Sequence, residues 1–245
     1  MDSIAFQYIP LFGLAVGSFL GLVIDRVPRG QSIVSPPSRC DHCHRRLTPL
    51  DLIPLLSYLV LRGRCRFCGV RIPIRSFLVE AATAAFFALV ILRFGQTSEA
   101  WVIVAFGSLF IAISVIDFEW TIIPDKLVLV GVIAALAVAP FGPAADGRTL
   151  AEAIVSIAVG GALGFGLMLL IYVGALMIYK SNVGFGFGDV KLGALIGLVT
   201  GFPEVLVALY IAFVSGGVVA ILRLLLKIRG RREGIPGPFW LPALS

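Results

Sequence analysis

The amino-acid sequence predicts an all-α protein that crosses a membrane several times. Of its 245 residues, 59% are apolar and only 14% are charged, and the mean hydropathy of +1.01 is far above that of soluble domains. Long apolar runs recur along the chain, and a helical span needs about 20 such residues to cross the hydrocarbon with its own backbone hydrogen bonds satisfied. These observations together favour a polytopic helical bundle.

Seven apolar runs mark the expected transmembrane helices. The fourth and sixth runs are short. Gly201, Phe202 and Pro203 interrupt the stretch from the sixth run to the seventh, which could therefore form two spans or one broken span. We expect about seven transmembrane helices, near residues 4–24, 77–92, 101–116, 127–138, 153–178, 192–202 and 205–226.

The distribution of charge predicts the orientation. The segment from Arg26 to Arg75 holds ten arginines and no lysine, and basic loops remain on the cytoplasmic side of a membrane. An odd number of spans then returns the basic residues after position 222 to the cytoplasm. The first run follows no basic region, so we expect it to be retained rather than removed as a signal peptide. Topology explains the basic loop, and we expect no nucleic-acid partner.

The expected organisation is a first transmembrane helix (1–24), a cytoplasmic loop (25–76), a helical domain (77–232) and a tail (233–245). The loop contains every cysteine of the chain, in two C-x-x-C pairs: Cys40 and Cys43, then Cys65 and Cys68. Four thiolates with this spacing suit a tetrahedral structural zinc site that leaves no open position. The loop is therefore expected to bind zinc.

Other interpretations of the cysteines are weaker. Disulfides are the main alternative, and a cytoplasmic location argues against them. A thioredoxin-like redox pair would need an alternation of strands and helices, which does not surround either motif. His42 and His44 could replace a thiolate, but we expect them to be solvent-facing loop residues. A metal would order a segment that lacks a core of its own.

Two aspartates lie where spans meet polar segments. Asp117 follows the third apolar run, and Asp189 ends the glycine-rich segment 184–189. The expected topology places both at cytoplasmic helix ends, where they can meet. Two close carboxylates share a proton, so that one can act as base and the other as acid when water attacks an amide. The sequence therefore indicates a paired-aspartate site.

Neighbouring residues support this interpretation. Gly186 and Gly188 permit tight turns and close approach of a substrate strand, and Pro124 separates the helix of Asp117 from the next span. Asp125 is expected to be a helix N-cap. A phosphate-binding turn at the glycines is disfavoured because no strand precedes them and the Rossmann spacing is absent.

These motifs resemble those of the bacterial prepilin peptidases, also called type IV leader peptidases. The resemblance rests on the Gly-x-Gly-Asp motif ending at Asp189, on Asp117 followed by Ile-Pro-Asp at 123–125, and on the paired C-x-x-C loop. Segments 17–20 with 26–28, 53–59 and 75–80 add to it, in matching order over most of the chain.

The resemblance implies a membrane aspartyl protease of the bacterial inner membrane with Asp117 and Asp189 as its catalytic pair. Its substrates would be prepilins or pseudopilins of type IV pilus or type II secretion systems, cut after a glycine that precedes a hydrophobic helix. Long family members often also methylate the new N-terminus with S-adenosylmethionine. Gly63 and Arg64 occupy the place of a Gly-Lys pair associated with that transfer.

The sequence departs from the family pattern in four places. Arg64 replaces lysine, which keeps the charge but changes the donor geometry. Gly21 and Leu52 stand where the family usually has asparagine, which removes polar groups near the presumed site. Segment 235–239 resembles one that normally opens a final helix, and because the chain stops at Ser245 we expect that helix to be missing or truncated.

Two other classes of function fit the sequence less well. A transporter or channel would carry ionisable residues near the middle of its spans, and the runs here are almost free of such charges. Glycines such as Gly17, Gly161 and Gly164 more plausibly permit close helix packing. A non-catalytic membrane scaffold of a pilus or secretion system could use the zinc loop for docking, but it leaves Asp117 and Asp189 without a purpose.

Overall fold

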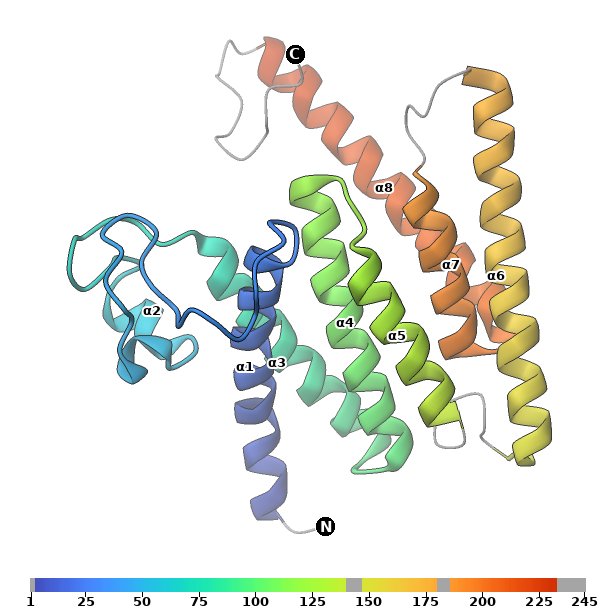
Figure 1. Cartoon of the computed structure of the whole chain (residues 1–245), viewed down its shortest axis with the longest axis horizontal. Coiled ribbons are helices and arrows are strands. Elements are labelled where there is room, and N and C mark those ends of the chain that lie inside the picture. Colours follow the sequence, from blue (N-terminus) through green and yellow to red (C-terminus); the bar gives the residue numbers. More distant parts are fainter. Residues whose placement is uncertain (1–2, 140–146, 180–185, 233–245) are drawn as a thin grey trace.

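The computed structural model describes residues 3–139, 147–179 and 186–232. Within these ranges every named element is a helix, which confirms the predicted all-α class (Figure 1). The elements are α1 (Ser3–Arg26), the 3-10 helix η1 (Pro49–Leu52), α2 (Leu56–Val60), α3 (Ile74–Phe94), α4 (Ser98–Trp120), α5 (Asp125–Val138), α6 (Leu150–Tyr179), α7 (Phe187–Thr200) and α8 (Glu204–Arg232). The tail predicted at 233–245 lies outside the described residues.

Five helices are long and apolar enough to cross a membrane, namely α1, α3, α4, α6 and α8. Helices α5 and α7 have 14 residues each, or about 21 Å, which is less than the roughly 30 Å of hydrocarbon. Seven helices nevertheless run alternately in opposite directions, with α7 and α8 as separate helices (Figure 1). The multi-pass architecture is therefore confirmed, and the count of seven spans stays a prediction.

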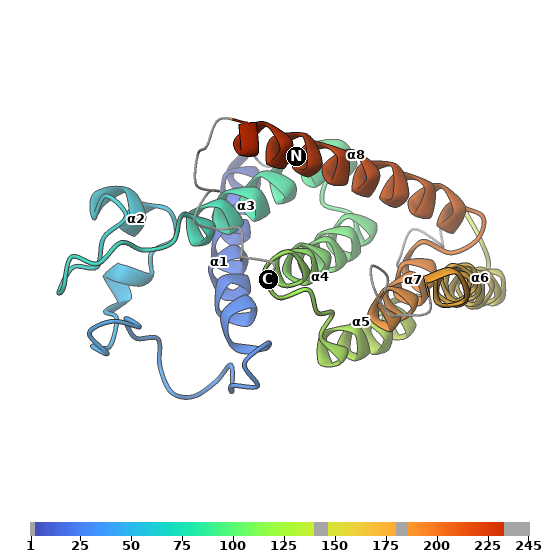
Figure 2. The same cartoon turned by 90° about the horizontal axis from the view of Figure 1, so that it is seen from above.

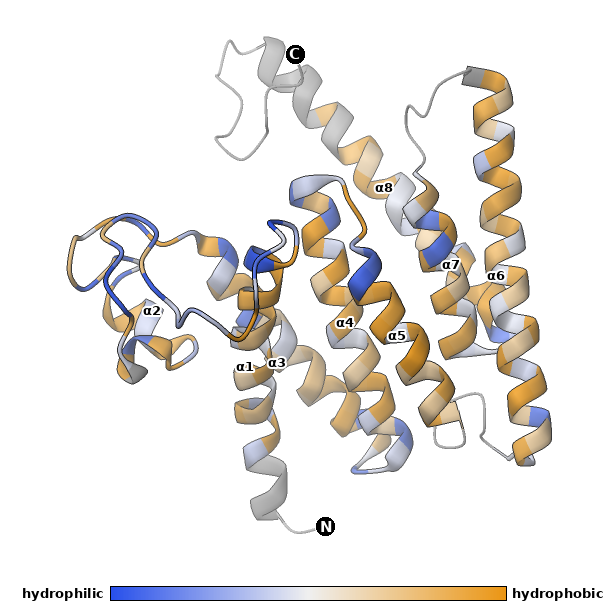
Figure 3. Ribbon diagram, in the orientation of Figure 1, coloured by the Kyte–Doolittle hydropathy of each residue, from blue (hydrophilic) through white to orange (hydrophobic). Residues whose placement is uncertain are grey.

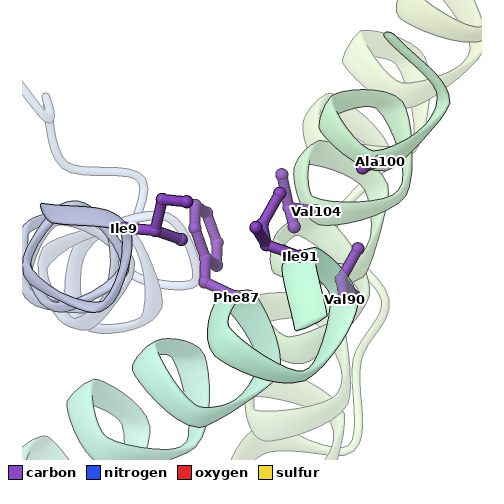
Figure 4. Close-up of a cluster of buried hydrophobic side chains, with 6 residues drawn as sticks. All are labelled: Ile9, Phe87, Val90, Ile91, Ala100 and Val104. Atoms are coloured by element: carbon purple, nitrogen blue, oxygen red, sulfur yellow. The ribbon is translucent and has the colours of Figure 1, made fainter. Parts of the chain in front are cut away.

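Helices α1, α3 and α4 share an apolar core. Figure 4 shows Ile9 of α1 facing Phe87 of α3, and Ile91 of α3 facing Val104 of α4. Helices α1 and α3 also approach each other closely because α1 carries a glycine at their contact: a Cβ on Gly17 would lie 2.7 Å from the Cα of Glu80. Small residues on α1 thus allow α3 to pack tightly, as the sequence predicted.

Helices α6 and α7 meet through glycines on both sides. A Cβ on Gly164 would lie 2.2 Å from the carbonyl oxygen of Gly193, and one on Gly160 would lie 2.5 Å from that of Gly197. Such contact between backbones is typical of helices packed in lipid. On its other side α7 buries Leu195 against α4 and α5, so α7 is held between α6 and these two helices.

The segment between α1 and α3 lies to one side of the bundle, next to these two helices (Figure 2). Hydrophilic residues gather in this loop and near the helix ends, whereas the helices between their ends are largely hydrophobic (Figure 3). In Figure 1 the C-terminal end of α4 and the N-terminal ends of α5 and α7 all lie at the upper side of the bundle. This arrangement brings the segments after Asp117 and before Asp189 to one side of the molecule.

Candidate active site

Asp117 lies in the last turn of α4, which continues to Trp120. The helix ends because Thr121 adopts a left-handed conformation, with φ of 54°, and its N–H donates to the carbonyl of Asp117 at 2.8 Å. The chain then runs without helix to Pro124. The predicted separation of the two helices at Pro124 is confirmed, and the side chain of Asp117 is exposed at the end of its helix.

Asp189 lies in the first turn of α7, which begins at Phe187. Its Oδ2 accepts a hydrogen bond of 3.0 Å from the backbone N–H of Gly186. A carboxylate at this end of a helix is stabilised by the helix dipole and by otherwise unsatisfied N–H groups. Asp189 is therefore held in place by its own helix start. Residues 184 and 185 of the glycine-rich motif lie outside the described residues.

The first turn of α7 packs against the connection between α4 and α5. A Cβ on Gly188 would lie 3.0 Å from the Cβ of Ile123, so glycine is what permits this approach. One turn further, the Nζ of Lys191 lies 2.7 Å from Oδ1 of Asp125. The structure thus joins the glycine motif that contains Asp189 to the segment that follows Asp117.

The expectation for Asp125 was wrong. The N-cap of α5 is Pro124, with φ of −68° and ψ of 118°, and Asp125 is already the first helical residue. Its carboxylate is 73% exposed and turns to Lys191 on α7 instead of to its own backbone. The physical reason is that a cation from a neighbouring helix is a stronger partner than a local N–H.

An ionic cluster near Asp117 was missed by the sequence analysis. Arg75, at the start of α3, forms ion pairs with Asp25 of α1 and Glu119 of α4. Arg29 also lies over the ring of Trp120, 5.8 Å from its centroid. The last turn of α4 is therefore tied to both ends of the loop. The sequence signal that could have predicted this cluster is the presence of opposite charges at the ends of three different spans.

The two cysteine pairs form a repeated hairpin. The N–H of Cys40 donates to the carbonyl of Arg45 at 3.0 Å, and the N–H of Cys65 donates to that of Val70 at 2.8 Å. His44 and Gly69 hold equivalent places in the two turns, with φ of 56° and 69°. Each hairpin therefore presents two thiols in the same way.

The four thiols converge. The Sγ atoms of Cys40, Cys43, Cys65 and Cys68 all lie within 4.8 Å of one another, and those of Cys40 and Cys68 are 3.8 Å apart. Sulfurs bound to one tetrahedral ion at about 2.3 Å are about 3.8 Å apart. Backbone N–H groups of Cys68 and Phe67 lower the pKa of Cys65 to about 7, whereas desolvation and the neighbouring thiols raise the pKa of Cys68, so a metal ion bound by all four sulfurs would displace protons from the cluster. The four cysteines can thus hold a metal ion, and His42 and His44 are exposed as expected.

Gly63 and Arg64 lie where the chain enters the second hairpin. Gly63 is buried with φ of 66°, and a Cβ on it would lie 2.9 Å from the ring of Tyr58. Glycine is therefore required here by the fold of the loop itself. Arg64 is exposed and pairs by its backbone with Arg71.

Two models of known protein families match the sequence, and together they cover most of the chain. Residues 11–94 match the model of the bacterial peptidase A24 N-terminal domain, and residues 103–221 match that of the type IV leader peptidase family. No solved structure matches the chain.

Three relatives bear the name prepilin leader peptidase/N-methyltransferase. The protein of Myxococcus xanthus is 39% identical over 88% of this chain, which spans 62% of that relative's length. The protein of Bacillus subtilis is 33% identical over 96% of this chain and 88% of its own. That of Pseudomonas putida is 32% identical over 94% and 84%, respectively. Because both family models match in order, and the Bacillus subtilis relative is 33% identical and covered over 88% of its length, the chain belongs to the type IV leader peptidase family.

Proposed function

We propose that this chain is a membrane aspartyl endopeptidase that removes the leader from type IV prepilins or pseudopilins, with Asp117 and Asp189 as its catalytic pair. The observation that carries the assignment is the contact of Gly188 with Ile123. It brings the start of the helix of Asp189 against the connection that follows Asp117. Family membership supplies the class of reaction.

Hydrolysis follows from two carboxylates on either side of one water. One carboxylate takes a proton as the water oxygen attacks the carbonyl carbon, while its protonated partner gives a proton to the carbonyl oxygen. The tetrahedral diol then collapses: the C–N bond breaks as the carboxyl that took the water's proton passes it to the amine nitrogen, and a diol hydroxyl gives its proton to the other carboxylate as the carbonyl re-forms. The N–H of Gly186 holds one carboxylate oxygen of Asp189, so the other oxygen can face the water.

The site is proposed to face the cytoplasm from the bacterial inner membrane. The arginine-rich loop supports this orientation, because basic loops remain on that side and Arg75 joins the loop to Glu119, close to Asp117 in α4. Hydrophobic helices of a substrate would lie in the same bilayer, with their leaders on the cytoplasmic side.

The metal is proposed to be zinc, held by Cys40, Cys43, Cys65 and Cys68. Four thiolates and no water position suit a structural ion that keeps the two hairpins together. The name shared by the relatives also supports methylation of the new N-terminal amine, for which S-adenosylmethionine would supply the methyl group. Gly63 and Arg64 are the candidate residues for that step. Because Gly63 is buried, it would contribute by shaping the loop and not by contacting the methyl donor.

The test is cleavage of a purified prepilin by the reconstituted protein, followed by mass spectrometry of the product. We expect Asp117→Asn and Asp189→Asn each to lower the rate by about 10²–10⁴-fold or more. Asp125→Asn is the matched control and should cleave within about tenfold of wild type, because an exposed ion pair contributes little. A product heavier by one methyl group when S-adenosylmethionine is present would add the second activity.

Two results would contradict the proposal. One is continued cleavage by a folded protein that carries both Asp117→Asn and Asp189→Asn. The other is a wild-type protein that cuts no prepilin, which would favour the non-catalytic scaffold.

A further inference from the structure

The loop between α1 and α3 exposes a run of large apolar side chains. Residues 50–60, which cover most of η1 and all of α2, contain six such side chains with exposed fractions between 38% and 68%: Leu50, Leu52, Ile53, Leu56, Leu59 and Val60. Proteins rarely leave contiguous apolar surface in water, and a patch of this kind marks contact with a membrane or another protein. A patch that contacts the membrane must lie level with the lipid along the helix axes, so its position along α3 distinguishes the two kinds of partner.

Two contacts with α3 fix the position of the apolar run along that helix. The N–H of Leu55 donates to Oε2 of Glu80 at 2.7 Å, and the ring of Tyr58 lies 5.3 Å from that of Phe77. Glu80 is five residues beyond Arg75 in α3, about 7.5 Å further along the helix axis. The apolar run is therefore docked on the flank of α3, a candidate membrane span.

The polar boundary of the bundle lies above this contact. Arg75 with Asp25 and Glu119 forms an ionic cluster at the ends of α1, α3 and α4, and such groups remain at the level of the headgroups. Figure 1 shows α2 beside α1, below the upper end of that helix, and Figure 2 shows α2 on the side of the bundle where α1 and α3 lie. The apolar run thus reaches past the ionic cluster towards the hydrocarbon.

The charged side chains in and beside the run are placed as contact with lipid requires, with the acid inside the run buried and the arginines outside it exposed. Asp51 is the one residue between Leu50 and Leu61 that is charged at neutral pH, and its side chain is only 4% exposed. It accepts hydrogen bonds from the hydroxyl of Thr48 at 2.7 Å and from Arg66 at 2.7 Å. The carboxylate is thereby turned away from the apolar surface. Exposed arginines flank the run on both sides: Arg45 and Arg46 before it, Arg62 and Arg64 after it.

We propose that residues 50–60 insert shallowly into the bilayer that holds α1 and α3, with their apolar side chains at the boundary between headgroups and acyl chains. The flanking arginines would contact anionic headgroups, as basic residues beside interfacial segments do. Ile74 and Leu78 of α3 are also exposed and continue the apolar surface towards lipid. This embedding is independent of the proposed proteolysis and would hold the metal hairpins at the membrane surface.

Photolabelling of the wild-type protein tests the inference. The protein is reconstituted in vesicles of phosphatidylcholine and phosphatidylglycerol that contain a lipid with a diazirine on its acyl chain, and tryptic peptides are mapped after irradiation. Peptide 47–62 contains the apolar run. Peptide 30–39 is the matched control, because it has the exposed Ile33 and Val34 but is held to the end of α1 by hydrogen bonds from Arg26 to Ser32 and Pro36.

We expect peptide 47–62 to carry at least about fivefold more label than peptide 30–39, in line with burial in the acyl boundary. A Leu56→Asn/Leu59→Asn variant should lose most of that label while the peptides of α3 keep theirs. Equal labelling of the two peptides would overturn the proposal. Undiminished label on peptide 47–62 in the Leu56→Asn/Leu59→Asn variant would also overturn it, since the label would then not depend on the apolar side chains.

Discussion

Gly188 of α7 lies so close to Ile123 that any side chain would disturb the contact. A Cβ at position 188 would stand 3.0 Å from the Cβ and 3.3 Å from the Cδ1 of Ile123. Ile123 belongs to the non-helical connection after Asp117, and Gly188 directly precedes Asp189. Packing of α7 against this connection therefore explains the second glycine of the motif, and the approach of a substrate strand stays a prediction.

Gly188→Ala should slow cleavage by roughly tenfold or more while the protein remains folded, because the added methyl group pushes the first turn of α7 away from the connection. The matched change is Gly186→Ala, where a Cβ would meet nothing closer than 3.7 Å, and its loss should be clearly smaller. Rates are measured with purified prepilin. Ile123→Gly combined with Gly188→Ala removes the Cβ that the added methyl group would meet at 3.0 Å and should recover part of the activity, and a double variant no faster than Gly188→Ala would contradict the packing argument.

Arg75 should matter for cleavage although it belongs to α3 and not to the paired aspartates. Its pairing with Glu119 ties down the last turn of α4, which carries Asp117. We expect Arg75→Gln and Glu119→Gln each to lower kcat, and the double variant to lose less than the sum, with a coupling of about 0.5–3 kcal/mol. Arg71→Gln, at an exposed arginine of the second hairpin, is the control. Fully additive losses would show that the pair does not act as a unit.

Metal removal should unfold the loop and spare the helices. Wild type is expected to contain one zinc per chain by elemental analysis, and Cys65→Ser should release it because a three-thiolate site binds more weakly. Trypsin would then cut quickly after Arg62 and Arg64, while circular dichroism keeps its helical signal. His42→Ala, next to Cys43 but outside the cluster, should retain the metal. Loss of zinc in that control would mean that the ligand set includes histidine.

The stability of the loop should depend on pH through Asp51. The hydroxyl of Thr48, together with the N–H of Thr48 and the side chain of Arg66, holds the pKa of Asp51 below its usual 3.8. A lowered pKa contributes stability that is complete above the unfolded value and is lost as the pH falls through the folded value. Hydrogen exchange of peptide 47–62 should therefore differ between wild type and Asp51→Asn equally at pH 7 and pH 5, and converge below about pH 4. Convergence already at pH 6 would contradict this cause.

The sequence predicted those features that depend on local pattern. Apolar runs indicated each long helix, because a segment that crosses lipid must form its backbone hydrogen bonds within itself, as a helix does. The spacing of Cys40, Cys43, Cys65 and Cys68 predicted their convergence, and Pro124 marked the end of the connection between α4 and α5. These signals are contained in short segments and needed no knowledge of tertiary contacts.

What the sequence could not predict were the contacts between distant segments. The ion pair of Arg75 with Glu119 joins residues 44 positions apart, and that of Lys191 with Asp125 joins residues 66 positions apart. Local propensity therefore assigned Asp125 to its own helix as an N-cap, whereas a cation on α7 determined its position. The depth of the apolar run at 50–60 likewise depends on the contact of Leu55 with Glu80, which no local pattern contains.

Close packing of α6 on α7 should set the position of Asp189 from the far side of its helix. A Cβ on Gly164 would lie 2.2 Å from the carbonyl oxygen of Gly193, so Gly164→Ala has to move α6 away from α7. We expect a cost of about 1–3 kcal/mol in stability, typical of overpacking, and a lower rate of cleavage.

Gly166→Ala provides the matched control on the same helix. A Cβ on Gly166 would have no neighbour within 4 Å, and alanine is the better helix former by about 1 kcal/mol. Thermal unfolding in detergent should therefore show a lower Tm for Gly164→Ala and an equal or higher Tm for Gly166→Ala. Equal losses in both variants would mean that lipid-facing flexibility, and not the backbone contact between α6 and α7, is what glycine provides in this helix.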